Sequence, residues 1–287
     1  MVAMLVALAA GASACVPTQL SVHRNLSSPL TMPQTLEELY VTYGAELRAL
    51  HERMRPWCHK TQSCKFCDTE AEMLYMLIRK WRPHDVFEMA PNKGYSSHFI
   101  LSALSANDHG RLDSFDIHNR AQHLMDPVLA RRWNFTLMDV QAAVPTAIAG
   151  ARFMRKYDFV FIDALHTEAF SSWYTRSLLT HPVACDTPVV IHDIVADMQG
   201  GGHESMAVYQ YMAFAHDVRH TFTMHRAHAP SPLARLDDAS AIDTIRSKVG
   251  LNGHQKYFRC SNESPSIFFV REQKRRMRSH GHGTRGA

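Results

Sequence analysis

The sequence lacks several features that would assign it to a class directly. Its longest largely apolar run, Val2–Ala14, is shorter than the roughly 20 residues that a membrane-spanning helix needs. The net charge is only +4, and the basic tail 272–287 has no aromatic residue on which a base could stack. No segment is repeated. These absences predict a protein without a transmembrane span in its mature chain and without a specific nucleic-acid partner.

The first 31 residues are predicted to be a signal or targeting segment. Val2–Ala14 ends in Ala12-Ser13-Ala14, a small-residue pattern like a signal-peptidase site. No lysine or arginine precedes the apolar run, as one usually does in a secretory signal. No acidic residue occurs before Glu37, which is also typical of organelle transit peptides. The sequence favours the secretory pathway or an organelle over the cytoplasm, with an unstructured start as the alternative.

Six cysteines remain after a cleavage at Ala14, and an even number suits disulfides in an oxidising compartment. Cys58, Cys64 and Cys67, with His59, also resemble half of a zinc site, but a second CxxC or HxxxH pair is missing. Disulfides and reduced thiols therefore remain equal alternatives, ahead of a metal site.

Residues 32–80 are expected to form an N-terminal helical extension. A capping box at Thr35 and apolar residues at helical spacing predict a first helix that ends near Arg55-Pro56. The cysteine-containing segment 57–67 should follow as a loop. A second helix is predicted for Thr69–Lys80.

From Trp81 to Arg271, short apolar strands alternate with helices. The predicted strands are Asp85–Met89, Arg111–Phe115, Asn134–Met138, Phe159–Ile162 and Pro188–Ile191, completed to seven near Thr221–Met224 and Ser266–Val270. The predicted helices are Ser96–Ser105, Ala121–Arg131, Val144–Phe153, Glu168–Leu179 and Ser205–Ala215. This alternation predicts an α/β domain, 81–271, with a Rossmann-like, doubly wound, seven-stranded sheet. The polar segment 226–264 is expected to be an insertion or lid, and 272–287 a disordered tail.

An acidic residue follows or ends each of the five predicted parallel strands. These residues are, in chain order, Glu88, Asp116, Asp139, Asp163 and Asp193. Ligands of open α/β sheets bind at the carboxyl ends of the strands, so the five acids should meet at one edge. Converging carboxylates are costly unless they hold cations or many hydrogen-bond donors. The sequence therefore predicts a positively charged ligand there.

A nucleoside that carries a positive charge suits these positions. Asp116 can accept both ribose hydroxyls, Asp139 can accept from an adenine amino group or cap the next helix, and Glu88 lies where a positive charge must be held. A pyrophosphate cofactor suits them poorly, because Glu88 would repel it and two glycines of GxGxxG are missing. A nicotinamide-dependent enzyme is therefore disfavoured.

The motifs carry a family resemblance. Phe87–Ser97 resembles motif I of class I S-adenosylmethionine-dependent methyltransferases, and Leu112–His118 is similar to motif II. Asp158–His166 followed by Val189–Ile194 resembles the small-molecule O-methyltransferases grouped as methyltransferase family 24. Ala90 and Asn92 stand where the family has glycines, although Asn tolerates a positive φ. The cofactor contacts that the resemblance implies are Glu88, Ala90, Asn92, Gly94, Tyr95, Ser96, Asp116, Ile117, Asp139 and Asp163.

The resemblance also implies a mechanism in which the acceptor oxygen lies in line with the sulfonium methyl group. In metal-dependent members, acids after the fourth and fifth strands hold Mg²⁺, and the matching positions are Asp163, His192 and Asp193. An imidazole ligand would suit Mn²⁺ or Zn²⁺ better. Alternatively, His166 or His192 acts as a metal-free general base beside Asp163.

The sequence thus predicts an S-adenosylmethionine-dependent methyltransferase that acts on a small hydroxylated substrate, and it is compatible with a homodimer. The alternative is a methyltransferase-like binding protein that has lost activity, which the altered motif I would favour. Acids retained at all five strand ends favour the active enzyme.

Overall fold

A single sheet occupies the centre of the structure, a computed structural model that describes residues 36–61, 68–179, 187–192, 194, 204, 207–208, 211, 218–223, 234–235, 239–251 and 267–271. Its strands are β1 (Asp85–Met89), β2 (Arg111–Asp116), β3 (Trp133–Leu137), β4 (Phe159–Ile162), β5 (Pro188–Ile191), β6 (Val218–Thr223), β7 (Ala234–Arg235) and β8 (Ile267–Arg271). They lie in the order β3-β2-β1-β4-β5-β8-β6-β7.

The strand order places a ligand site at the centre of the sheet. Strands β1 to β5 are parallel, and β8 runs antiparallel between β5 and β6. The chain proceeds outward from β1 to β2 and β3 on one side and returns to β4 on the other. The strand order therefore reverses between β1 and β4, which is where open α/β sheets bind ligands. The expected doubly wound sheet is confirmed. Among the described residues it has eight strands instead of seven, because the two-residue β7 pairs with β6.

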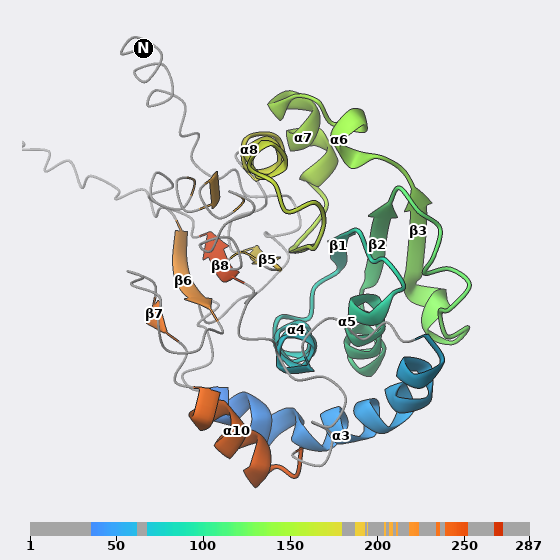
Figure 1. Ribbon diagram of the computed structural model, residues 1–287, viewed down its shortest axis with the longest axis vertical. Helices are drawn as coiled ribbons and strands as arrows, with labels where there is room; N and C mark the ends of the chain where they lie inside the picture. Colours follow the sequence, from blue (N-terminus) through green and yellow to red (C-terminus); the bar gives the residue numbers. More distant parts are fainter. Residues whose placement is uncertain are drawn as a thin grey trace, which may run out of the picture.

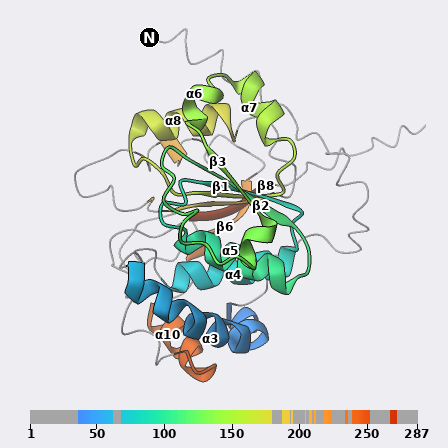
Figure 2. The same cartoon turned by 90° about the vertical axis from the view of Figure 1, so that its right-hand side faces the viewer.

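Helices cover both faces of the sheet (Figures 1 and 2). On one face lie α6 (Val140–Ala143), α7 (Ala147–Met154) and α8 (Glu168–Ser177). On the other lie α4 (Asp68–Trp81) and α5 (Tyr95–Ala106), and beneath them a further layer holds α3 (Leu36–Thr61) and α10 (Ala239–Lys248). No helix in the described part of the chain is long and apolar enough to cross a membrane.

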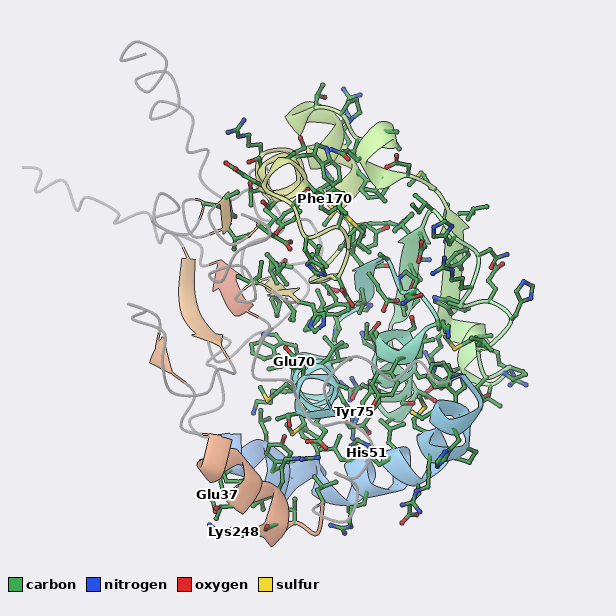
Figure 3. All side chains as sticks on the ribbon, in the orientation of Figure 1. Glu37, His51, Glu70, Tyr75, Phe170 and Lys248 are labelled. Atoms are coloured by element: carbon green, nitrogen blue, oxygen red, sulfur yellow. The ribbon has the colours of Figure 1, made fainter. Side chains whose placement is uncertain are left out.

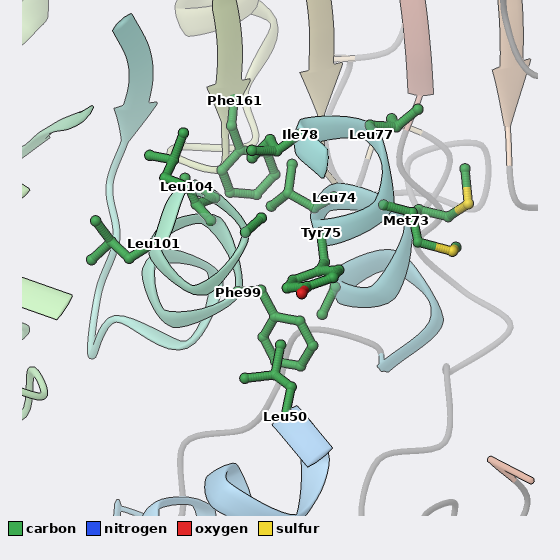
Figure 4. Packing of buried hydrophobic residues seen from close by; sticks show 14 of the residues in the cluster. Leu50, Met73, Leu74, Tyr75, Leu77, Ile78, Phe99, Leu101, Leu104 and Phe161 are labelled. Carbon is green, nitrogen blue, oxygen red and sulfur yellow. The ribbon is translucent and has the colours of Figure 1, made fainter. Parts of the chain in front are cut away.

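Alternation along β4 supplies both hydrophobic cores. Phe159 and Phe161 pack with the residues of α3, α4 and α5, whereas Val160 and Ile162 pack with those of α7 and α8. Figure 4 shows Phe161 over the apolar side chains of α4 and α5. Because both faces are covered, the strand is apolar throughout, as a buried parallel strand should be.

A buried ion cluster joins the two outer helices to α4. The Glu72 carboxylate accepts hydrogen bonds from the Tyr40 hydroxyl at 2.7 Å and from Arg246 Nε and Nη2 at 2.8 and 2.7 Å. His51 Nε2 lies 2.7 Å from Glu72 Oε1, the carboxylate oxygen to which Arg246 Nη2 also donates. We call these four residues, Tyr40, His51, Glu72 and Arg246, the helical anchor. It fixes α10 against α3 and α4, although 174 residues separate Arg246 from Glu72.

Prolines explain where the predicted helices were wrong. The first helix does not end at Pro56 but continues to Thr61, because Met54 and Cys58 are buried on either side of the proline. The predicted helix 121–131 is absent: Pro127 lacks an N–H, Asp126 accepts from the Val128 N–H, and only the 3₁₀ turn Leu129–Arg132 forms.

The predicted helix 144–153 is divided into α6 and α7. Pro145 disfavours a helical conformation at Val144, and the Thr146 side chain caps α7 by accepting from the Ala149 N–H. The predicted helix 205–215 lies mostly outside the described residues, although positions 204, 207, 208 and 211 are helical.

Cys58 is disulfide-bonded, which favours the disulfide alternative for this residue. It lies inside α3 rather than in the loop predicted for 57–67. The other five cysteines and the Thr35 capping box lie outside the described residues.

Candidate functional site

The turn after β1 takes an unusual backbone conformation. Ala90, Asn92 and Gly94 have positive φ angles of 59°, 51° and 90°. Only glycine adopts this region without cost, and such strain in a non-glycine residue is concentrated at functional sites. The two residues that replace the expected glycines therefore still form the tight turn that leads into α5.

Glu88 lies at the end of β1 and is fully buried. Three hydroxyl groups donate to its carboxylate: Ser96 at 2.6 Å, Ser97 at 2.7 Å and Ser114 at 2.5 Å. Burial raises the pKa of Glu88, and the nearby Asp163 raises it further, while the three hydroxyls oppose that shift. No cationic side chain of the described residues donates to it, so a positive ligand at this edge would stabilise the charged form.

Asp116, at the end of β2, connects the two loops beside it. The Asn92 N–H donates to its Oδ2 at 3.0 Å, and the His118 N–H donates to its Oδ1 at 2.9 Å. Each carboxylate oxygen keeps a further lone pair for a ligand. The next residue, Ile117, is 62% exposed, so an apolar side chain stands in solvent beside a buried acid. A ribose next to a flat apolar base fits this pair.

Asp163 and two histidines follow β4 and β5. His166 Nε2 lies 3.9 Å from Asp163 Oδ1. Burial raises the pKa of Asp163, His192 and His166 oppose the shift, and the negative charges of Glu70 and Asp116 add to it. We call Glu88, Asp116, Asp163, His166 and His192 the strand-end rim.

A buried carboxylate stands behind each histidine of the rim. Glu204 Oε2 lies 2.7 Å from His166 Nδ1, and Glu70 Oε2 lies 3.5 Å from His192 Nδ1. Both glutamates are 2% exposed. Figure 3 shows Glu70 on α4, so the N-terminal extension contributes a charged group to the site.

The remaining predicted site residues lie elsewhere or are engaged otherwise. Asp139 caps α6, where its Oδ1 accepts from the Gln141 and Ala142 N–H groups at 2.9 and 3.2 Å. The Tyr95 ring packs in the core, 5.1 Å from the Phe99 ring. Asp193 lies outside the described residues. Within the part of the chain that the structure describes, no three His, Cys, Asp or Glu side chains are placed to hold a metal ion.

Sequence reasoning did not identify Glu70 or Glu204. Glu70 looks like an ordinary acid in the first turn of a helix, where a negative charge is favourable anyway. Glu204 closes the run Gly200-Gly-Gly-His-Glu204, whose glycines are typical of a flexible loop. Neither residue has a local signal. What distinguishes each of them is a histidine at a strand end within reach, and this contact is visible only once the fold is known.

Comparison with protein-family models gives one match, which covers strands β2 to β5 of the sheet. A family model described as a methyltransferase domain, that of methyltransferase family 24, matches residues 91–194. That range extends from the turn after β1 to just beyond β5. None of the curated proteins matches the chain. The resemblance inferred from the motifs is thereby confirmed.

Solved structures similar to the chain include two O-methyltransferases. One is TomG from Streptomyces achromogenes, involved in tomaymycin synthesis and solved with S-adenosylmethionine; it is 14% identical, with a TM-score of 0.46 over 78% of this chain and 89% of that one. The other, from Bacillus cereus with S-adenosylhomocysteine, is 12% identical, with a TM-score of 0.46 over 86% of this chain and 94% of that one.

Proposed function

We propose that this chain, which carries a methyltransferase domain of class I topology, transfers the methyl group of S-adenosylmethionine to a hydroxyl oxygen of a small molecule. The observation that carries the proposal is the acidic strand-end rim at the reversal of strand order, where Glu88 is buried without a cationic partner among the described residues. S-adenosylmethionine brings two positive charges, its sulfonium and its amino group. The rim therefore suits this cofactor better than an anionic one.

The chain's own residues divide the binding of the cofactor between them. Asp116 accepts the ribose hydroxyls through the free lone pairs of its carboxylate, and Ile117 covers one face of the adenine. The turn Ala90–Gly94 brings backbone close to the ligand, as a turn with positive φ angles permits. Glu88 holds the start of α5, which follows the turn, through Ser96 and Ser97 and supplies negative charge there.

His166 is the better candidate of the two histidines for the general base. Its side chain is 39% exposed, whereas that of His192 is 9% exposed, so a substrate can reach it. The acceptor oxygen forms a bond to the methyl carbon as the carbon–sulfur bond breaks, and its proton passes to His166. The electron pair of the broken bond remains on sulfur. Most of the rate enhancement then comes from holding the two reactants in line.

A divalent metal is a separate part of the proposal. Asp163, His192 and Asp193 would hold it, and the mixed oxygen and nitrogen donors suit Mn²⁺ or Zn²⁺ at least as well as Mg²⁺. When bound, the ion would lower the pKa of the acceptor hydroxyl. Loss of methyl transfer on treatment with a chelator, and its return on adding one of these metals, tests this part separately.

The cofactor is tested by isothermal titration of the full chain with S-adenosylmethionine and S-adenosylhomocysteine, with and without Mg²⁺. We expect Asp116→Ala to weaken binding about 100-fold, because two hydrogen bonds to a charged group are lost. The matched control is Asp126→Ala, which removes an exposed carboxylate from the loop after β2 that lies outside the rim. Absence of binding by the unmodified chain in every condition would overturn the proposed function.

The reaction is tested with radioactively labelled S-adenosylmethionine and a panel of small phenols and sugars. A labelled product identifies the acceptor class. We expect His166→Gln to lower transfer at least as much as a lost general base does, about 100-fold, without weakening cofactor binding.

We also propose that the protein works in an oxidising compartment. The disulfide of Cys58 supports this, because disulfides persist in secreted and lumenal proteins and are rare in the cytosol. Residues 1–31 fused to a fluorescent reporter test the proposal. Export of the reporter or its uptake into an organelle is expected, and a diffuse cytosolic signal would contradict it.

A further inference from the structure

We propose that Glu204 is a positioning residue for His166, and this inference rests on the proposed function. Glu204 Oε2 lies 2.7 Å from His166 Nδ1, and the Tyr174 hydroxyl donates to Glu204 Oε1 at 2.8 Å. The three side chains thus form a chain of hydrogen bonds from the core to the strand-end rim. The sequence motifs of the domain do not include Glu204 or Tyr174.

Glu204 is buried, and so is the tyrosine that donates to it. Tyr174, on α8, is fully buried. Burial, and to a smaller extent the charge of Glu204, raises the pKa of the Tyr174 hydroxyl, so that it stays protonated and donates. Val208 is buried in the core of the same face, and the Tyr211 hydroxyl donates to the Leu179 carbonyl at 2.9 Å. Glu204 is therefore held against α8 through Tyr174. A carboxylate held in this way can orient a neighbouring ring.

The contact with Glu204 determines which nitrogen of His166 is available. A carboxylate accepts, so the neutral imidazole must carry its proton on Nδ1 and keep a lone pair on Nε2. Nε2 is the nitrogen that faces Asp163, at 3.9 Å, and the side chain is partly exposed. The basic nitrogen therefore points to the rim, where the acceptor hydroxyl of the proposed reaction lies.

The charge of Glu204 has a second effect. When His166 takes the proton of the acceptor, the ring becomes an imidazolium ion, and the carboxylate beside Nδ1 compensates its charge. This arrangement, a base oriented by a buried acid, is the general form of activated acid–base pairs in enzymes. A merely structural contact would hold Glu204 against α8 without making Nε2 of His166 more nucleophilic.

Diethyl pyrocarbonate tests the proposal without knowledge of the methyl acceptor, because it acylates an unprotonated imidazole nitrogen. The rate at His166 is followed by peptide mass spectrometry at pH 8 in the full chain. We expect Glu204→Gln to slow this rate on the order of threefold, because a less basic nitrogen is a weaker nucleophile. Tyr174→Phe should slow it less, since the carboxylate remains. Glu168→Gln, an exposed acid in the first turn of α8, is the matched control and should leave the rate unchanged.

The direction of the change separates the two roles of Glu204. If it only fastened the segment, its loss would expose His166 and the rate would rise, and an unchanged rate would equally overturn the proposal. Thermal unfolding and titration with S-adenosylmethionine are measured on the same variants. We expect cofactor affinity to stay at the level of the unmodified chain. Failure of the unmodified chain to bind the cofactor would instead overturn the proposed function, while leaving the reactivity comparison readable.

Discussion

Glu72 in the helical anchor and Glu88 in the strand-end rim are both fully buried, but their pKa values shift in opposite directions. Burial by itself would raise the pKa of Glu72, yet Arg246 and His51 outweigh it and lower that pKa to about 2. At Glu88 burial prevails over three serine hydroxyls, and the pKa rises. A buried glutamate is therefore stabilised in its charged form in the helical anchor, whereas in the strand-end rim its charged form is destabilised.

Under the proposed function, this difference separates a structural carboxylate, Glu72, from one that serves a ligand, Glu88. A buried charge is tolerated when it is paired, and a buried charge without a counterion is costly unless something outside the fold supplies one. Helix α10 completes the anchor from within the chain through Arg246. In the rim, the proposed function assigns the missing positive charge to S-adenosylmethionine. Perturbed carboxylates in a ligand-binding edge are thus evidence of function with a stated physical cause.

The largest expected effect is loss of the anchor. Glu72→Gln leaves Arg246 buried without its counterion, and breaking a buried pair in this way costs about 3–5 kcal/mol of unfolding free energy. Urea unfolding followed by circular dichroism measures it. Glu37→Gln is the control, because Glu37 pairs with Lys248 across the same two helices but in solvent. A loss at Glu72 no greater than that at Glu37 would show that the anchor does not stabilise the fold.

The anchor should also make stability depend on pH in acid. The folded-state pKa of Glu72 is about 2 and its ordinary value is 4.5, so the carboxylate stabilises the fold above pH 4.5. This contribution, about 3 kcal/mol, is lost as the pH falls from about 4.5 to about 2. Unfolding free energies of the unmodified chain and of Glu72→Gln, measured through this range, should converge. A constant difference would mean that the charge of Glu72 is not its source.

Glu88→Gln should act in the opposite sense on stability. The neutral amide avoids the burial cost of the charge, so the midpoint of thermal unfolding should stay the same or rise. Affinity for S-adenosylmethionine should fall on the order of tenfold, about 1.4 kcal/mol, because negative charge is lost at the cationic ligand. Scanning calorimetry measures the unfolding midpoint of the variant, and titration calorimetry of the same preparation measures its affinity for S-adenosylmethionine. A destabilisation comparable to that of Glu72→Gln would make Glu88 a structural residue.

The strands and several acids of the strand-end rim could be predicted from the sequence because their signals are local. The bounds of β1, β4 and β5 agree with the prediction residue for residue. For β4 and β5 the reason is that a strand buried on both faces is a short continuous apolar run. Asp163 was found for the same reason, since it directly follows such a run, whereas Glu88 and Asp116 were found because they lie at the ends of predicted strands.

The helical anchor was not predicted, nor were the two carboxylates behind the rim histidines, Glu70 and Glu204. In each case the interacting residues are distant in the chain. Glu72 is one of three acidic residues in the first half of α4, and nothing in that sequence distinguishes it from the other two. Its counterion Arg246 lies in a segment predicted only as a lid or insertion. Glu204 meets His166 across 38 residues. No local pattern distinguishes a buried acid from a solvated one when the partner that makes burial tolerable comes from another element.

Asp139 offers the smallest and most discriminating test, because it follows a parallel strand of the sheet, as acids of the strand-end rim do, yet caps a helix. Both capping bonds go to Oδ1, and Asn caps a helix about as well as Asp, so Asp139→Asn should change stability by less than about 0.5 kcal/mol. Asp139→Ala should cost about 1 kcal/mol. If the residue is only a cap, neither variant weakens binding of S-adenosylmethionine in a titration. Weaker binding by Asp139→Asn at unchanged stability would place this acid with Glu88, as one whose charge serves the ligand.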